Sequence, residues 1–203
     1  VVHQSAAHTP TAESAEFITH FYGYTRAFLK VQTGCDSRCA YCIIPLARGP
    51  ARSMPADQVV EQIRVLVARD YKEVVLTGIN LGSWGTDSGE GRPADLVRRL
   101  LGETGVESLR LSSVEPLQVD DGLLDAVAEA GDRFAHHFRL PLQSGTDAVL
   151  RRMRRPYTAD EYLRVAREIA HRFPCAAIGA DVIVGFPGET DADFDKTMKL
   201  IDD

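Results

Sequence analysis

The length, composition and charge of the chain exclude several classes of protein. It has 203 residues and 44% hydrophobic content, enough for one domain with a sizeable core. No apolar run is long enough to cross a membrane, and residues 1–20 lack the charged-then-apolar pattern of a signal peptide. The net charge of −6, from 23 basic and 29 acidic residues, is the wrong sign for a free-standing nucleic-acid binder. Clustered cysteines argue against an oxidising compartment, so we expect a cytoplasmic protein without membrane contact.

After a polar tail or linker at residues 1–25, strand-like and helix-like stretches alternate along the chain. Apolar stretches with strand-like patterning predict five strands, at residues 27–33, 73–78, 109–113, 137–142 and 180–185. Apolar residues at helical spacing predict a helix after each strand, at residues 55–67, 96–101, 123–128, 158–170 and 194–201. Pro55 opens the first of these helices, and a capping box of Thr158 and Glu161 opens the fourth.

Repeated strand–helix units imply an α/β fold with parallel strands and right-handed crossovers. Such strands either curve into a barrel or form an open doubly wound sheet. Polar residues at the C-terminal ends of the predicted strands favour a barrel, because barrel enzymes build their active sites on that face. These residues are Cys35, Asn80, Ser113, Glu115, Gln143, Ser144 and Glu189.

Three cysteines lie within one loop after the first predicted strand. Cys35, Cys39 and Cys42 have the spacing C-x3-C-x2-C, with Tyr41 directly before the last of them. A 4Fe–4S cube has four irons that each need one ligand besides the sulfides, so three thiolates leave one iron open. An open iron suits a cluster that binds and reduces a small molecule rather than one that only carries electrons. We therefore predict Cys35, Cys39 and Cys42 as catalytic residues and as the metal ligands of one 4Fe–4S cluster.

Two other interpretations of the cysteine loop are weaker. A zinc site needs a fourth Cys or His nearby, but the nearest histidine upstream is His20 and none follows before His136. A disulfide would leave one of the three thiols unpaired. The remaining cysteine, Cys175, follows Pro174, and we interpret it as a buried thiol rather than a ligand.

The cysteine spacing resembles the signature of the radical S-adenosylmethionine (SAM) superfamily. Residues 34–53, GCDSRCAYCIIPLARGPARS, resemble more specifically the core motif of the radical SAM methylthiotransferases. Two further blocks, at residues 137–147 and 181–190, are similar to that family, and the match runs from about Arg26 to the C-terminus. Residues 76–85, LTGINLGSWG, resemble the branch that acts on N6-threonylcarbamoyladenosine in the tRNA anticodon loop. The isopentenyladenosine and ribosomal-protein branches, which carry Gly-Gln-Asn and Gly-Gln-Asp there, remain alternatives, as does another radical SAM enzyme.

The resemblance implies a transferase with a partial (β/α)6-type radical SAM barrel of about five βα units. Residues 26–203 are then an incomplete core without the family's second-cluster domain and RNA-binding module. The implied cofactors are SAM, the 4Fe–4S cluster of this chain and a second cluster in the full-length protein. The implied chemistry starts with one-electron cleavage of SAM and ends with a methylthio group on carbon 2 of the adenine ring. The implied partners are tRNA and a one-electron reductant such as flavodoxin or ferredoxin.

By the same resemblance, residues near the strand ends are candidates for SAM binding. They are Tyr41, Gly78, Asn80, Ser113, Glu115, Gln143, Gly185 and Phe186. Simple core packing of Tyr41 and a surface position of Glu115 are the competing interpretations. Because arginines neutralise phosphates, the candidates for RNA binding are Arg48, Arg52, Arg151, Arg152, Arg154 and Arg155. A solvated helix end is the alternative for the basic run at residues 151–155.

Overall fold

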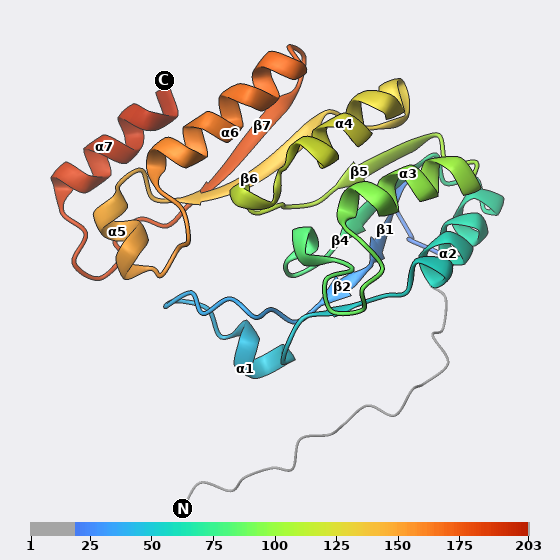
Figure 1. Cartoon of the computed structure of the whole chain (residues 1–203), viewed down its shortest axis with the longest axis horizontal. Helices are drawn as coiled ribbons and strands as arrows, with labels where there is room; N and C mark the ends of the chain where they lie inside the picture. The colour runs from blue at the N-terminus through green and yellow to red at the C-terminus, as the bar shows by residue number, and fades with distance from the viewer. Residues whose placement is uncertain (1–18, 203) are drawn as a thin grey trace, which may run out of the picture.

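Five parallel strands form an open arc in the computed structural model, which describes residues 19–202 (Figure 1). They are β1 (Arg26–Lys30), β4 (Glu73–Thr77), β5 (Ser108–Leu111), β6 (His137–Gln143) and β7 (Ala177–Val182). One parallel sheet contains β1, β4 and β5, and β6 pairs in parallel with β7. Single parallel bridges, Leu109 to Phe134 and Ser113 to Arg139, connect the two sheets. The predicted α/β arrangement is confirmed, while residues 1–18 of the predicted tail lie outside the described residues.

Helices lie along one side of the arc, where Figure 1 shows α2, α3, α4 and α6 side by side with the strands. The long helices are α2 (Ala56–Ala68), α3 (Pro93–Glu103), α4 (Asp121–Ala130), α6 (Ala159–Arg172) and α7 (Asp191–Asp202). The capping box of α6 is confirmed: the Glu161 N–H donates to Thr158 Oγ1 at 3.2 Å, and the Thr158 N–H donates to the Glu161 carboxylate at 2.8 Å. Among residues 19–202, no helix is long and apolar enough to cross a membrane.

Short helical segments that the sequence analysis did not predict occur between these elements. Two are α-helices, α1 (Ile44–Arg48) and α5 (Asp147–Arg152). Three are 3₁₀ turns, η1 (Leu81–Ser83), η2 (Pro116–Gln118) and η3 (Gly131–Arg133). α1 directly follows Cys42 and Ile43 in the segment between β1 and α2, and α5 follows β6, so both short helices belong to the connections that leave the C-terminal ends of strands.

The hydrophobic core lies between the strands and the helices that cover them. On β1, Ala27 and Leu29 are buried, whereas Phe28 between them is 37% exposed, because successive side chains of a strand point to opposite faces. The buried side continues along the sheet through Val74, Leu76, Leu109 and Leu111. Full burial of such a side chain stabilises the fold by about 1.5–3 kcal/mol. This packing leaves the ends of the strands free to carry polar groups.

Three predicted strands match observed strands to within two residues at each end, and the other two differ more from the structure. The predicted strand 27–33 divides, because β2 (Gln32–Thr33) leaves the parallel sheet and pairs antiparallel with β3 (Arg52–Ser53). The division is at Val31, whose N–H donates to the Thr77 carbonyl at 2.9 Å and whose carbonyl accepts from the Met54 N–H at 2.8 Å. The predicted strand 180–185 instead spans residues 177–182 as β7. Pairing of β2 with β3 brings together the two ends of the segment that carries the clustered cysteines.

Candidate functional site

A close crossing of the backbone closes the cysteine loop, defined as residues 34–51. Gly34 opens the loop at φ +70°, and a Cβ placed there would lie 1.9 Å from the carbonyl oxygen of Pro50. The Cys35 N–H donates to the Gly49 carbonyl at 3.1 Å. Glycine is required at position 34 because the site needs both a left-handed backbone and the absence of a side chain.

The buried side chain of Gln32 ties the cysteine loop to the end of β4. Its Nε2 donates to the carbonyls of Thr33 and Gly34, both at 3.0 Å, and its Oε1 accepts from the Asn80 N–H at 2.8 Å. Gln32 is only 2% exposed, so these bonds form where an unpaired amide would be unfavourable. They hold the start of the loop beside the predicted residues Gly78 and Asn80.

All three cysteines of the loop are partly buried and have free thiols. Cys35 Sγ accepts from the Ser37 N–H at 3.4 Å and lies 4.0 Å from Asn80 Nδ2. Cys39 Sγ accepts a hydrogen bond from the Arg155 guanidinium at 3.2 Å. Within residues 19–202, no three His, Cys, Asp or Glu side chains converge on a single metal ion, but each thiolate of a cube binds a different iron. Three free thiols in one loop, with N–H donors directed at two of the sulfurs, fit a 4Fe–4S cluster.

Arg155 lies in this site and not on the RNA surface predicted for it. Its side chain is 4% exposed and pairs with the carboxylate of Glu115. Its Nε donates to the Tyr157 hydroxyl at 3.1 Å. A buried guanidinium that is paired with a carboxylate is not available to the backbone of RNA. Arg155 is therefore removed from the set of predicted RNA-binding arginines. Glu115, for which SAM binding and a plain surface charge were the expectations, serves here as the counter-ion of Arg155.

Two aromatic residues bring the cysteine loop and the segment after β7 together. The rings of Tyr41 and Phe186 meet edge to face, with centroids 6.5 Å apart and an interplanar angle of 84°. Burial raises the pKa of the Tyr41 hydroxyl to about 12, against the opposing charge of Arg155, so this group is protonated at neutral pH. Phe186 is fixed in turn by Glu189, whose carboxylate accepts the N–H of Gly185 at 2.6 Å and of Phe186 at 3.1 Å.

The remaining predicted SAM-binding residues also lie at strand ends. Gly78 directly follows β4, and a Cβ there would come 3.0 Å from the Gln32 side chain. Ser113 forms the parallel bridge between β5 and β6, and Gln143 ends β6 with φ +65°. The Oδ1 atom of Asn80 is buried and has no hydrogen-bond partner among the described residues. A buried acceptor of this kind calls for a donor that a bound molecule can supply.

Two expectations about burial differ from the structure. Ser144, predicted to face the site, is fully buried, and its Oγ lies 3.5 Å from Thr197 Oγ1 of α7. It therefore joins the packing between β6 and α7. The prediction that Cys175 is a buried thiol was wrong, because this residue is exposed in the turn between α6 and β7.

The other predicted RNA-binding arginines are exposed: Arg48, Arg52, Arg151, Arg152 and Arg154. The Arg52 guanidinium donates to the carbonyl of Arg48 at 3.4 Å, so Arg52 contacts the C-terminal part of the cysteine loop, where Arg48 lies. Arg151 and Arg152 form the last turn of α5, where Arg152 also donates to the Gly188 carbonyl at 2.8 Å. Exposed arginines at the C-terminal end of a helix can complement the helix dipole, and they can also contact a phosphate. Both interpretations of the basic run therefore stay open.

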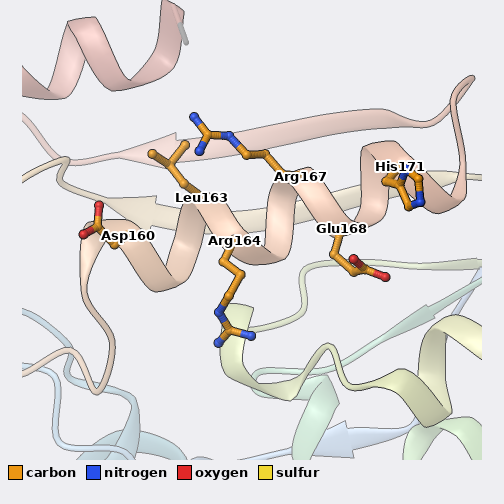
Figure 2. Close-up of a pocket in the computed structure, with 6 residues that line it drawn as sticks. All are labelled: Asp160, Leu163, Arg164, Arg167, Glu168 and His171. Atoms are coloured by element: carbon orange, nitrogen blue, oxygen red, sulfur yellow. The ribbon is translucent and has the colours of Figure 1, made fainter.

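A hollow on α6 is distinct from this site. Figure 2 shows Arg164 and Arg167 pointing in opposite directions from the helix that lines it. Its lining residues are Asp160, Leu163, Arg164, Arg167, Glu168 and His171, none of which the sequence analysis assigned to a site. All six belong to one helix, so the hollow is a feature of the α6 surface rather than a place where strand ends meet.

The chain matches the Radical SAM superfamily over residues 29–201. It belongs to the radical SAM superfamily. This assignment covers all five parallel strands except the first three residues of β1, and it includes the whole cysteine loop.

Curated relatives of this radical SAM protein include two groups of tRNA-modifying enzymes. Threonylcarbamoyladenosine tRNA methylthiotransferase MtaB of Bacillus subtilis (strain 168) is 41% identical over 182 residues, 89% of this chain and 40% of that protein. The tRNA-2-methylthio-N(6)-dimethylallyladenosine synthase of Syntrophomonas wolfei subsp. wolfei is 40% identical over 177 residues, 87% of this chain and 40% of that protein. The chain thus spans about 40% of the length of these relatives.

Solved structures of radical SAM enzymes share the fold at lower identity. The radical SAM methyltransferase TsrM from Kitasatospora setae, bound to tryptophan and a SAM analogue, has a TM-score of 0.67 at 19% identity, covering 86% of this chain and 34% of that one. Methylornithine synthase PylB has a TM-score of 0.60 at 16% identity, covering 87% of this chain and 49% of that one. These similarities confirm the predicted partial radical SAM barrel.

Two residues that organise this radical SAM site, Gln32 and Tyr157, carry little or no signal in the sequence. Gln32 is a polar residue within a strand-like apolar stretch, which is the one sequence signal for it. The structure buries this side chain. Tyr157 is 4% exposed, and its hydroxyl donates to the Pro141 carbonyl at 2.6 Å while it accepts from Arg155. No local pattern marks such a residue, because its partners come from β6 and from the segment after α5.

Proposed function

We propose that this chain is the radical SAM core of a tRNA methylthiotransferase that acts on carbon 2 of N6-threonylcarbamoyladenosine in the anticodon loop. The cysteine loop carries the proposal: it lies in the connection that leaves the C-terminal end of β1 and presents three free, partly buried thiols with N–H donors directed at two of the sulfurs. Support for the substrate comes from relatives about 40% identical that are named threonylcarbamoyladenosine tRNA methylthiotransferases. Residues 26–203 then form the core domain of a longer cytoplasmic enzyme.

Within this proposal, Cys35, Cys39 and Cys42 hold a 4Fe–4S cluster, which together with SAM supplies the one-electron chemistry that starts the reaction. The protein's own residues bind and orient. Asn80 offers its unpaired, buried Oδ1 to a donor of bound SAM. Tyr41, whose ring meets that of Phe186 edge to face, carries a neutral hydroxyl, since burial raises its pKa to about 12. The remaining wall of the proposed SAM site consists of Gly78, Ser113, Gln143, Gly185 and Phe186.

The proposed partners are tRNA and a one-electron reductant such as flavodoxin or ferredoxin. Because the chain has a net charge of −6, contact with tRNA depends on local basic groups. The exposed groups proposed for this role are Arg48, Arg52, Arg151, Arg152 and Arg154. A second cluster, as the source of the transferred sulfur, belongs to the remainder of the full-length enzyme in this proposal.

The isopentenyladenosine branch is the second candidate. Its support is the 40% identity of this chain to a tRNA-2-methylthio-N(6)-dimethylallyladenosine synthase. Relatives from the threonylcarbamoyladenosine branch are 40% and 41% identical to this chain, so overall identity does not separate the two branches. Residues 76–85 favour the threonylcarbamoyladenosine branch, because they lack the Gly-Gln-Asn of the isopentenyladenosine branch.

Nucleoside mass spectrometry of tRNA from a strain without the full-length gene tests both candidates. We expect loss of the methylthio group on N6-threonylcarbamoyladenosine and its retention on the isopentenyl nucleoside. Complementation with the intact gene should restore the modification, and a Cys39→Ala gene should not. The opposite pattern of loss would assign the isopentenyladenosine branch. Retention of both modifications would overturn the proposal that the enzyme methylthiolates tRNA.

A further inference from the structure

We infer that Arg155 positions the Cys39 thiolate and, together with Glu115, sets the reduction potential of the proposed cluster. This inference rests on the proposed function, because it takes Cys39 as a cluster ligand. The direct observation is the 3.2 Å contact between the Arg155 guanidinium and Cys39 Sγ, two groups 116 residues apart in sequence. A second contact joins the same two segments: the Ala40 N–H donates to the Met153 carbonyl at 3.0 Å.

Two residues, Glu115 and Tyr157, hold the guanidinium in place. Glu115, at the entry to η2, forms its ion pair, and the two side chains are 29% and 4% exposed for Glu115 and Arg155. Tyr157 accepts from Arg155 Nε at 3.1 Å, and its ring centre lies 4.9 Å from the guanidinium carbon. Tyr157 is itself anchored to β6 through the Pro141 carbonyl at 2.6 Å. An arginine fixed in this way directs its N–H groups along defined lines, which gives its contact with Cys39 a fixed geometry.

The charge of Arg155 persists in this buried position. A guanidinium is not deprotonated in proteins, and the carboxylate of Glu115 supplies its counter-charge here. A cationic donor on a thiolate stabilises negative charge on the cluster, and a reduced cluster carries one more negative charge than an oxidised one. Hydrogen bonds to the sulfurs and local charge are known determinants of cluster potential, so Arg155 favours the reduced state. Glu115 offsets part of this effect because its charge has the opposite sign.

Redox titration of the anaerobically reconstituted chain, followed by electron paramagnetic resonance, tests the two opposing effects. We expect Arg155→Met to shift the midpoint potential of the cluster to more negative values. We expect Glu115→Gln to shift it to more positive values, because the charge of Arg155 is then less compensated. Arg164→Met, an exposed change on α6, is the matched control and should leave the potential and spectrum unchanged. Arg155→Lys, which keeps the charge but loses the planar fork, should shift the potential in the same direction as Arg155→Met but by less.

Iron and sulfide content separate failure of this inference from failure of the proposed function. A chain that binds no cluster in its unsubstituted form would overturn the proposed function. A fully loaded Arg155→Met protein with an unchanged potential would overturn only the inference about Arg155. Shifts of the midpoint potential in the same direction in Arg155→Met and Glu115→Gln would also overturn it. A general loosening of the site would shift both potentials in one direction, whereas opposite charges shift them in opposite directions. If Arg155→Met does not fold by circular dichroism, Arg155→Lys carries the same test, and an unchanged potential there overturns the inference.

Discussion

The side-chain oxygen of Gln32 accepts a hydrogen bond from the main-chain N–H of Asn80 at 2.8 Å, which joins the start of the cysteine loop to the end of β4. The other end of the same amide donates to the carbonyls of Thr33 and Gly34. One buried side chain therefore satisfies backbone groups at or just after the ends of β2 and β4. The position of Cys35 relative to Asn80 depends on this amide.

Replacing Gln32 with Leu should destabilise the fold and loosen the cysteine loop. Three backbone groups would be left without their partners in a buried position, and each such group costs about 1–3 kcal/mol. We expect a lower free energy of unfolding in urea and a lower iron content after reconstitution. Gln58→Leu, an exposed change on α2, is the control and should stay within about 0.5 kcal/mol of the parent. Equal stability of the two variants would show that the Gln32 bonds contribute nothing.

Two glycine substitutions should change stability in opposite directions. Gly34→Ala places a Cβ 1.9 Å from the Pro50 carbonyl oxygen at φ +70°, so the loop has to shift at a cost of at least about 1–3 kcal/mol. Gly102→Ala lies in α3 with nothing within 4 Å of its Cβ, and it should stabilise the helix by roughly 0.5–1 kcal/mol. Thermal unfolding followed by circular dichroism compares the two. A neutral Gly34→Ala would contradict the close crossing of the loop.

Cluster binding should depend on three cysteines and not on the fourth. Cys35→Ala, Cys39→Ala and Cys42→Ala should each abolish the oxygen-sensitive 4Fe–4S centre, because a cube with one open iron needs all three thiolates. Cys175→Ala should leave the iron and sulfide content unchanged, since Cys175 is exposed in a turn outside the loop. Metal analysis and absorption spectra after anaerobic reconstitution provide the measurement. A cluster that survives Cys39→Ala would remove that residue from the ligand set.

The reconstituted chain should perform only the first half of the proposed reaction. With SAM and a strong reductant, we expect slow release of 5′-deoxyadenosine, because no substrate orders the site. Incubation with tRNA should add no methylthio group, since the sulfur donor of the proposed enzyme lies outside this core. Liquid chromatography with mass spectrometry detects both products. Methylthiolated adenosine formed by this chain alone would refute the division of the reaction between two parts of the enzyme.

Binding of tRNA to the full-length enzyme should depend on the exposed part of the basic run. The double change Arg151→Ala and Arg154→Ala should weaken binding for all tRNA sequences and reduce the salt slope by about 1 for each phosphate that is no longer neutralised. Arg164→Ala on α6 is the matched exposed control and should leave affinity unchanged. Filter binding across a range of salt concentrations gives both quantities. If affinity is unchanged by the double change, the run serves as a helix end, and the RNA path should be sought near Arg48 and Arg52.

Local patterns in the sequence determined much of this protein. The spacing of Cys35, Cys39 and Cys42 places three thiols in one short loop whatever the rest of the chain does. Likewise, the capping box of Thr158 and Glu161 acts within one turn of helix, and the structure shows it as predicted. The alternation of strand and helix periodicity predicted five parallel strands because each element reveals its buried face in its own residues.

Tertiary structure alone decided the roles of residues whose partners are distant in sequence. Arg155 belongs to a basic run in the sequence, yet in the fold it pairs with Glu115 and Cys39 and is buried. The first predicted strand divides at Val31 because the two residues after it find an antiparallel partner beyond the cysteine loop. A charged side chain can be buried only when the fold supplies its counter-ion. The partners of Arg155 are distant in sequence, so the residues that neighbour it in the chain do not predict its burial.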